Sequence, residues 1–210
     1  MRQSDVMVYL MTGFLDSGKT QFLTFTLEQD YFQIQGKTLL ILCEEGEEEY
    51  DPKEMLKYGV VIEKVEDKED LTEAWLEEMN RKHKPERVVV EYNGMWPVSD
   101  FEKLALPAGW KIEQKIATVD ASTFQMYLTN LKPLFVEMVK GAELVLFNRC
   151  EDIKPLAGYR RSVKVVSPQA EVIFEDEQGE VENIFEDDVP YDLDAPVIEI
   201  PREDYGIWYV

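Results

Sequence analysis

Eight consecutive residues near the start of the chain have the pattern of a loop that binds phosphate. Residues 13–20 read Gly-Phe-Leu-Asp-Ser-Gly-Lys-Thr, which satisfies G-x-x-x-x-G-K-[ST] without a gap. In such a loop the glycines let successive backbone N–H groups point into one concavity, and the following helix directs the positive end of its dipole to the same place. The pattern therefore predicts a nucleotide site, with a glycine turn that holds no ligand as the competing interpretation.

Each side chain of this loop has an expected task. Lys19 should reach the β- and γ-phosphates and stabilise the charge that develops during phosphoryl transfer, and the Thr20 hydroxyl should bind Mg²⁺. The residues of this segment that we expect to contact nucleotide are Gly13, Asp16, Ser17, Gly18, Lys19, Thr20 and Gln21.

Asp16 is an unusual residue for a loop that holds polyphosphate. Three arrangements are open to its carboxylate: it points outward, it contacts water bound to Mg²⁺, or it helps to position the attacking water, which would make it a catalytic residue. A carboxylate at this place could also weaken binding, because like charges at close range repel.

Strands and helices alternate along the chain. Apolar runs suited to buried parallel strands lie at 6–11, 37–43, 87–91, 111–119, 143–148 and, for a short sixth strand, 162–166. Helices are predicted at 21–32, 71–83 and 122–140, the last kinked or split at Pro133. This alternation predicts an α/β fold with a mainly parallel, doubly wound sheet that is covered by helices on both faces.

Acidic side chains follow two of these strands. Glu91 ends the third strand, where a carboxylate beside a phosphate loop could hold Mg²⁺ through water. A strand-end glutamate that faces solvent is the alternative. Residues 44–51, after the second strand, contain five glutamates and Asp51. They form either a solvated loop or an acidic switch that binds Mg²⁺ or another hard cation through oxygen.

Taken together, these segments resemble the CobW/HypB/UreG class of GTPases, in particular its CobW-like branch. The loop is similar to that branch's Gly-Phe-Leu-Gly-(Ala/Ser)-Gly-Lys-Thr, with Asp16 at the fourth position. After the second strand, Glu44, Gly46, Glu47 and Asp51 match in register the family's Asn-Glu-Phe-Gly-Glu and the Asp four residues later. The resemblance implies a first switch segment that responds to the γ-phosphate and Mg²⁺, with Asp51 as a metal ligand.

The segment after the third strand extends the resemblance. Residues 91–97, Glu-Tyr-Asn-Gly-Met-Trp-Pro, are similar to the family's Glu-Thr-Thr-Gly-Leu-Ala-Asp-Pro. The match implies that Glu91 acts on Mg²⁺ or on the nucleophilic water, and that the Gly94 N–H senses the γ-phosphate.

The fifth strand ends where the family carries its guanine-reading motif, Asn-Lys-x-Asp. Residues 148–152 here read Asn-Arg-Cys-Glu-Asp, so Asn148 is kept, Arg149 replaces Lys, and Glu151 replaces Asp, with Asp152 as a nearby substitute. The resemblance implies that Asn148 and Glu151 bind the base. Guanine is the favoured base, and ATP is the less favoured nucleotide.

Two departures from the family are evident. The family's Gly-Cys-x-Cys-Cys metal motif corresponds to residues 59–63 here, which read Gly-Val-Val-Ile-Glu, so thiolate zinc binding at that place is excluded. The family's usual C-terminal domain has no room in 210 residues.

The composition restricts the kinds of partner. A net charge of −21, from 43 acidic and 22 basic residues, argues against a nucleic-acid partner and disfavours binding to anionic lipid. The two cysteines fit neither a zinc pattern nor a disulfide framework, and the apolar run at 6–11 is too short for a membrane span. We expect a cytoplasmic protein that does not insert into membranes.

The chain divides into two expected parts. Residues 1–170 form a P-loop nucleotide-binding domain, similar to the SIMIBI class of P-loop NTPases, and residues 171–210 form an extended or β-structured acidic segment. That segment either adds a final strand to the domain or leads to a downstream domain that this chain lacks.

The function expected from the sequence is that of a nucleotide switch. The chain would bind GTP with Mg²⁺ and hydrolyse it slowly, with Lys19, Glu91 and Asp16 as catalytic residues and Thr20, Glu91 and Asp51 at the metal. By family analogy its output would be an unknown protein partner in metal or permease homeostasis, and a homodimer is left open. The alternative is a degenerate P-loop module that binds partners and hydrolyses nucleotide weakly or not at all.

Overall fold

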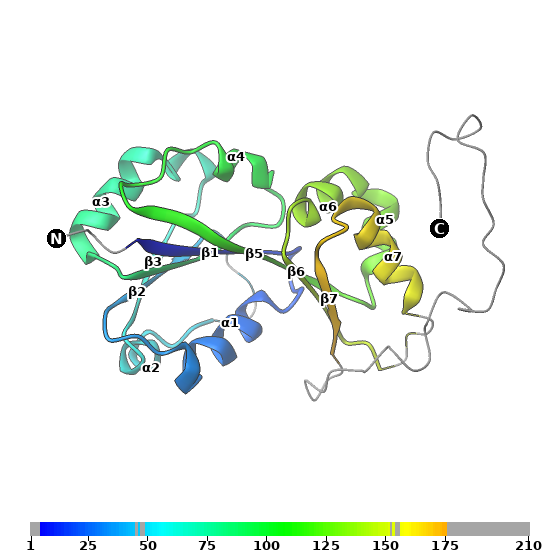
Figure 1. The fold of residues 1–210 in the computed structure, drawn as a ribbon, viewed down its shortest axis with the longest axis horizontal. Helices are drawn as coiled ribbons and strands as arrows, with labels where there is room; N and C mark the ends of the chain where they lie inside the picture. The colour runs from blue at the N-terminus through cyan, green and yellow to red at the C-terminus, as the bar shows by residue number, and fades with distance from the viewer. Residues whose placement is uncertain (1–4, 45, 47–48, 152, 154–155, 176–210) are drawn as a thin grey trace.

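A computed structural model describes residues 5–44, 46, 49–151, 153 and 156–175 of the chain. Its centre is a seven-stranded parallel sheet with strand order β3-β2-β4-β1-β5-β6-β7 (Figure 1). The strands are β1 (Val6–Thr12), β2 (Thr38–Leu42), β3 (Val60–Lys64), β4 (Arg87–Glu91), β5 (Trp110–Asp120), β6 (Leu144–Asn148) and β7 (Glu171–Phe174). Parallel strands need crossover connections, and these are supplied by the helices between them.

Helices cover both faces of this sheet (Figure 1). The α-helices are α1 (Lys19–Glu28), α2 (Pro52–Lys57), α3 (Glu73–His83), α4 (Val98–Glu102), α5 (Phe124–Asn130), α6 (Lys132–Val139) and α7 (Ala157–Val166), with short 3₁₀ turns η1 (Asp30–Phe32) and η2 (Lys68–Asp70). Apolar residues of α1 and α2 cluster with one face, and those of α3 to α7 with the other. The predicted doubly wound α/β fold is therefore confirmed.

The central strands are buried on both faces, as the continuous apolar runs predict. All five residues of β2 and of β4 are buried, and Val88, Val89 and Val90 have no exposed surface. Strands that lie between two helical layers have no solvent-facing side, so a run of β-branched residues replaces the usual alternation.

The predicted set of strands needs one correction and two additions. Residues 162–166 were expected to form a strand, but they belong to α7, in which Val163 is buried and Val165 is 78% exposed. The sheet position beside β6 is taken instead by β7, and β3 is a further strand that the predicted set lacks. Pro133 does split its helix, because α6 begins at Lys132 with the proline in its first turn.

The first four residues of the predicted C-terminal segment are β7, which pairs with β6 in the same sheet. Residues 176–210 lie outside the described part of the chain, so the prediction of an extended segment there stays a prediction. Within the described residues, no helix has both the length and the apolar character that crossing a bilayer requires.

The topology brings the sequence motifs to one edge of the sheet. β1 pairs with β4 on one side and β5 on the other, and Met11 lies opposite Glu91. In β5 and β6, Asp120 lies opposite Asn148. The loop after β1 therefore begins between the carboxyl ends of β4 and β5, where α/β sheets bind their ligands.

Candidate functional site

The loop at residues 13–20 ends in a helix terminus that no described side chain caps. Gly18 is the N-cap residue of α1 and takes a left-handed backbone conformation, with φ of 86°. An added Cβ at Gly18 would lie 2.3 Å from the Asn148 side-chain nitrogen, so both the conformation and the space require glycine. The first N–H groups of α1 have no intrahelical acceptor, which makes this terminus suited to an anion.

Contacts from three other elements fix the shape of the loop. The hydroxyls of Ser17 and Thr118, on β5, are 2.8 Å apart and buried. The Phe14 ring stacks on Tyr127 of α5 with 4.2 Å between ring centroids. Gly94 lies against the loop so closely that an added Cβ would be 2.1 Å from the Gly13 carbonyl oxygen. The predicted residues Gly13, Ser17 and Gly94 are thus brought together as parts of one packed loop.

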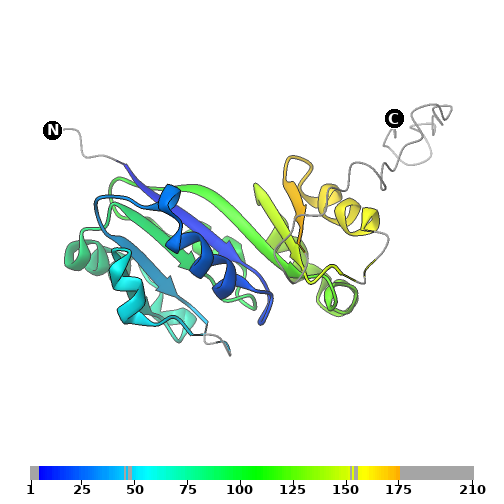
Figure 2. The same cartoon turned by 90° about the horizontal axis from the view of Figure 1, so that it is seen from below.

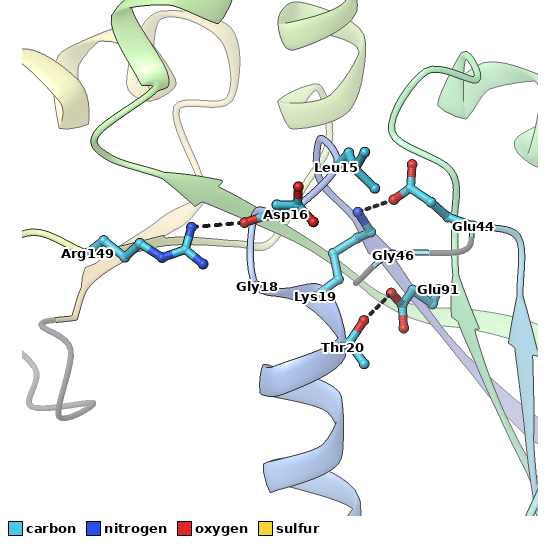
Figure 3. Close-up of a pocket in the computed structure, with 9 residues that line it drawn as sticks. All are labelled: Leu15, Asp16, Gly18, Lys19, Thr20, Glu44, Gly46, Glu91 and Arg149. Carbon is cyan, nitrogen blue, oxygen red and sulfur yellow. Dashed lines mark hydrogen bonds and ion pairs between the residues drawn. The ribbon is translucent and has the colours of Figure 1, made fainter. Parts of the chain in front are cut away.

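Lys19 is buried under the loop and is held by the chain itself. Its amino group donates to the carbonyl oxygens of Gly13 and Phe14 at 2.8 and 2.9 Å. It also forms an ion pair with Glu44 at 2.5 Å, and the two side chains are only 3% and 9% exposed (Figure 3). Because Glu44 lies where the loop opens, its carboxylate takes the position beside Lys19 that an anionic ligand would need.

Thr20 and Glu91 meet beside Lys19, as the sequence predicts. The Thr20 hydroxyl donates to Glu91 Oε1 at 2.8 Å (Figure 3). The other oxygen, Glu91 Oε2, accepts a 2.5 Å hydrogen bond from the Tyr50 hydroxyl. Glu91 is 4% exposed, so it does not face solvent. Burial raises the pKa of Glu91, and the hydrogen bonds from Tyr50 and Thr20 partly oppose this shift.

Asp16 lies at the outer rim of the loop. It has φ of 59° and is exposed, and aspartate is among the few residues that adopt this backbone conformation at low cost. The glycine that the related loops carry at this position suits the same conformation. Arg149 donates to the Asp16 carbonyl oxygen at 3.0 Å and also pairs with the Asp120 carboxylate. These contacts tie the rim of the loop to the ends of β5 and β6.

Of the two predicted base-binding residues, Asn148 contacts the loop, whereas Glu151 lines neither the central pocket nor the neighbouring groove. The Asn148 side-chain nitrogen donates to the Ser17 carbonyl oxygen at 2.9 Å, which joins the end of β6 to the phosphate loop. The buried oxygens Asn148 Oδ1 and Glu151 Oε1 have no hydrogen-bond partner among the described residues. Buried acceptors without a partner are costly, so a ligand that donates hydrogen bonds at this place would be stabilised.

Two further predicted residues lie outside the central pocket. The Asp51 carboxylate caps α2 by accepting from the N–H groups of Lys53 and Glu54, at 2.9 and 3.5 Å. It does not line the pocket that Thr20 and Glu91 share. Gln21 is exposed in the first turn of α1, where it lines a neighbouring groove.

The pocket between these groups is small. It has a volume of about 110 Å³, and its lining is Leu15, Asp16, Gly18, Lys19, Thr20, Glu44, Gly46, Glu91 and Arg149 (Figure 3). The Glu44 carboxylate lies within this pocket on Lys19, so a phosphate that approached the Lys19 amino group there would compete with it.

Within the described residues, no group of three or more His, Cys, Asp or Glu side chains could hold a metal ion. One hydroxyl and one carboxylate, from Thr20 and Glu91, are nevertheless a donor set that suits Mg²⁺, which usually keeps several waters and takes phosphate oxygens as further ligands. The residues present therefore fit a magnesium ion that arrives with a nucleotide, and they do not form a complete protein cage.

The parallel sheet, the phosphate loop and the convergence of strand ends on it define a P-loop NTPase-like domain. Residues 7–174 match the CobW/HypB/UreG nucleotide-binding domain, so the chain belongs to this family. The comparison with curated proteins gave no match.

Solved structures of the same architecture include two kinds of family member. The hydrogenase maturation factor HypB from Archaeoglobus fulgidus is 19% identical, with a TM-score of 0.55 over 83% of this chain and 82% of that one. HypB from Helicobacter pylori, in complex with nickel, is 14% identical, with a TM-score of 0.56 over 83% and 80%. The Zn(II)-bound YjiA GTPase from E. coli is 22% identical, with a TM-score of 0.58; the match covers 81% of this chain and 57% of YjiA. At these identities the likeness shows the fold.

The structure places two residues, Tyr50 and Glu44, in contacts at the site that the sequence pattern did not predict. Tyr50 is 9% exposed although it follows an acidic run, and an aromatic side chain in such a run is the signal that could have marked it as buried. Glu44 was part of the resemblance, but its ion pair with Lys19 joins residues of two separate loops, and no local pattern indicates it.

Proposed function

We propose that the chain is a nucleotide switch that binds GTP with Mg²⁺ and hydrolyses it slowly. The observation that supports this most is the single pocket shared by the buried Lys19 amino group, the uncapped start of α1 and the Thr20–Glu91 pair, all within the described part of the chain. A cation, a set of free N–H groups and a hydroxyl–carboxylate pair are the groups that a triphosphate with its magnesium ion requires.

In this proposal the chain acts mainly by positioning and by charge. Lys19 and the N–H groups at the start of α1 stabilise negative charge on the phosphates, and Asp16 at the rim orients water. Thr20 and Glu91 hold Mg²⁺, directly or through water. When bound, the ion neutralises charge on the phosphate oxygens.

The switch would be the exchange of one anion for another on Lys19. In one state of this switch, Glu44 pairs with Lys19, as in the structure. The phosphates displace this carboxylate, so the segment after β2 takes a second position while nucleotide is bound. Because Gly94 lies against the phosphate loop, the segment after β4 takes part in the same change. Hydrolysis and phosphate release restore the ion pair.

Guanine is the base that the other end of the site favours. Its N1–H and N2–H₂ groups donate hydrogen bonds, whereas the corresponding edge of adenine has an acceptor at N1. The Glu151 acceptor, which no described group satisfies, suits donors, so GTP should bind better than ATP.

Titration of the purified full chain with GTP, ATP and their diphosphates, with and without Mg²⁺, tests the proposal. We expect micromolar binding of GTP that depends on Mg²⁺, and ATP binding at least tenfold weaker, which corresponds to about 1.4 kcal/mol. Lys19→Ala provides the loss-of-function control, and Lys111→Ala, which removes an exposed lysine of β5, provides the matched charge control.

One observation favours a second function, that of a degenerate module that binds partners. The ion pair between Lys19 and Glu44 satisfies the buried lysine without any nucleotide, so the fold does not need one. Absence of binding at millimolar GTP in the same titration would favour this alternative. ATP binding tighter than GTP binding would instead favour an ATP-dependent enzyme.

The cellular role in this proposal is cytoplasmic, with a protein partner whose activity depends on the bound nucleotide. A role in metal or permease homeostasis is suggested by the family, whose solved members include a nickel complex of HypB and a Zn(II)-bound YjiA. The chain's net charge of −21 supports a partner other than nucleic acid.

A further inference from the structure

A second, larger hollow lies beside the phosphate loop, between α1 and the sheet. This groove has a volume of about 840 Å³. One wall is formed by α1 and η1, and the floor by β5 and β6 on the same face of the sheet. At one end it reaches Gly18, Asn148 and Arg149, so it begins at the nucleotide site and runs away from it.

The walls of this groove are aromatic and partly exposed. Five rings line it, those of Tyr9, Phe22, Phe25, Tyr31 and Phe32. Phe25 is 62% exposed and Tyr31 is 78% exposed, which is unusual for large apolar side chains that line the same groove. On the floor, Ile116 and Leu144 continue the apolar surface.

The described helices leave this part of the sheet without a cover. α5, α6 and α7 contribute their apolar residues to the cluster on the opposite face of β5, β6 and β7. On the groove side, α1 and α2 are the described helices that pack against the sheet, and their cluster includes residues of β1 to β5. Figure 2 shows α1 over β1, with β6 and β7 extending beyond it.

The chain itself continues from this groove. Glu175, the last described residue, is one of the groove's lining residues, so residues 176–210 start at its edge. Their sequence is acidic from 176 to 204 and then changes to Tyr-Gly-Ile-Trp-Tyr-Val at 205–210, a run without charge. The groove lining has one basic and one acidic residue, Arg149 and Glu175, and is otherwise uncharged. An uncharged aromatic run therefore suits it, whereas the acidic stretch does not.

Length and attachment favour the same occupant. About 30 residues separate Glu175 from the aromatic run, and an extended chain of that length reaches about 100 Å, several times the length of a typical strand. A segment attached to the same chain meets the groove at an effective concentration on the order of millimolar. We propose that residues 205–210 dock in the groove between α1 and the β5–β6 face, with Trp208 as the aromatic anchor beside Phe25 and Tyr31.

The indole N–H resonance of Trp208 in the full chain, without nucleotide, tests this docking. The resonance is assigned by its loss in Trp208→Phe. We expect it away from the random-coil position in the unaltered chain, and we expect it to return to that position in the Phe25→Ser/Tyr31→Ser double variant. The matched control is Met126→Ser, which removes an apolar residue that is 53% exposed on α5, over the opposite face, and should leave the resonance unchanged.

A reciprocal variant keeps the test independent of the groove substitutions. In Trp208→Ser we expect the backbone amide resonances of Phe25 and Tyr31 to shift, while that of Met126 does not. The docking is overturned if the Trp208 resonance of the unaltered chain lies at the random-coil position. It is also overturned if the resonance does not change position in the Phe25→Ser/Tyr31→Ser variant. A shift that grows with protein concentration, together with a doubled hydrodynamic mass, also overturns it, because the occupant is then a second copy of the chain. Since nucleotide is absent throughout, failure here is separate from failure of the proposed GTP binding.

Discussion

The phosphate end and the base end of the candidate site differ in whether their buried polar groups have partners within the chain. At the phosphate end the charged side chains have partners within the chain: Glu44 pairs with Lys19, and Thr20 and Tyr50 donate to the two oxygens of Glu91. At the base end, Asn148 and Glu151 each keep a buried oxygen that no described residue satisfies. In the proposed function a nucleotide displaces a chain carboxylate at one end and satisfies unused acceptors at the other.

This difference indicates how binding energy would be divided. Phosphate binding replaces one ion pair by another, so its net gain is smaller than its contacts suggest. Base binding replaces an unsatisfied acceptor by a hydrogen bond, which contributes about 1.5–3 kcal/mol when one partner is charged. In the proposed function, the base end would therefore give selectivity, and the phosphate end would give the switch.

The largest effect is expected from Lys19→Ala. Removal of the cation at the phosphate end should weaken GTP binding at least 100-fold, about 2.7 kcal/mol, while the circular dichroism spectrum stays that of the folded chain. Calorimetric titration beside Lys111→Ala measures it. Unchanged affinity would show that the loop does not hold the phosphates.

The next effect concerns the base end. Glu151→Ala should remove the acceptor that prefers guanine and reduce the ratio of GTP to ATP affinity about tenfold, about 1.4 kcal/mol, with little effect on ATP itself. Glu171→Ala, which removes an exposed glutamate at the start of β7, is the control. If both nucleotides weaken equally, Glu151 does not read the base.

A smaller effect of opposite sign is expected at Glu44. Glu44→Gln removes the carboxylate that competes with phosphate for Lys19, so GTP and GDP should bind about three- to tenfold more tightly. Glu49→Gln makes the same charge change at an exposed residue of the same segment and should have no such effect. Weaker binding in Glu44→Gln would mean that Glu44 helps to hold the ligand.

The smallest effect is on stability and its pH dependence. Burial raises the pKa of Glu91 in the folded chain above its value in the unfolded chain. The stability that its protonated form contributes is therefore fully present below the pKa of the unfolded state, and it is lost as pH rises through the pKa of the folded state. Glu91→Gln, which stays neutral, should therefore melt above the unaltered chain at pH 7, and the gap should close toward pH 4. Each kcal/mol gained would raise Tm by about 2–4 °C in a chain of this size. Melting curves without nucleotide or Mg²⁺ measure this, and a gap that widens at low pH would contradict it.

The sequence predicted the elements whose signal is local. The phosphate loop has a fixed spacing, and Arg87–Glu91 is an apolar run closed by a carboxylate, so the residue pattern was sufficient to place both. Residues 162–166 misled the prediction because their valines favour strands, whereas they form the end of α7, from which Val163 packs into the core.

Contacts between distant loops could not be predicted in this way. The pairing of Lys19 with Glu44 and the bond from Tyr50 to Glu91 depend on strand order, which brings the ends of β1, β2 and β4 together. The role of Asp51 as the cap of α2 depends likewise on where that short helix begins.

The exchange of Glu44 for phosphate on Lys19 is the central claim, and a crystal structure of the full chain with Mg²⁺ and a GTP analogue that resists hydrolysis tests it most directly. We predict β- and γ-phosphate oxygens within hydrogen-bond distance of the Lys19 amino group, Mg²⁺ near Thr20 and Glu91, and the Glu44 carboxylate displaced. A nucleotide bound elsewhere, or a Lys19–Glu44 ion pair that persists beside bound nucleotide, would contradict the claim.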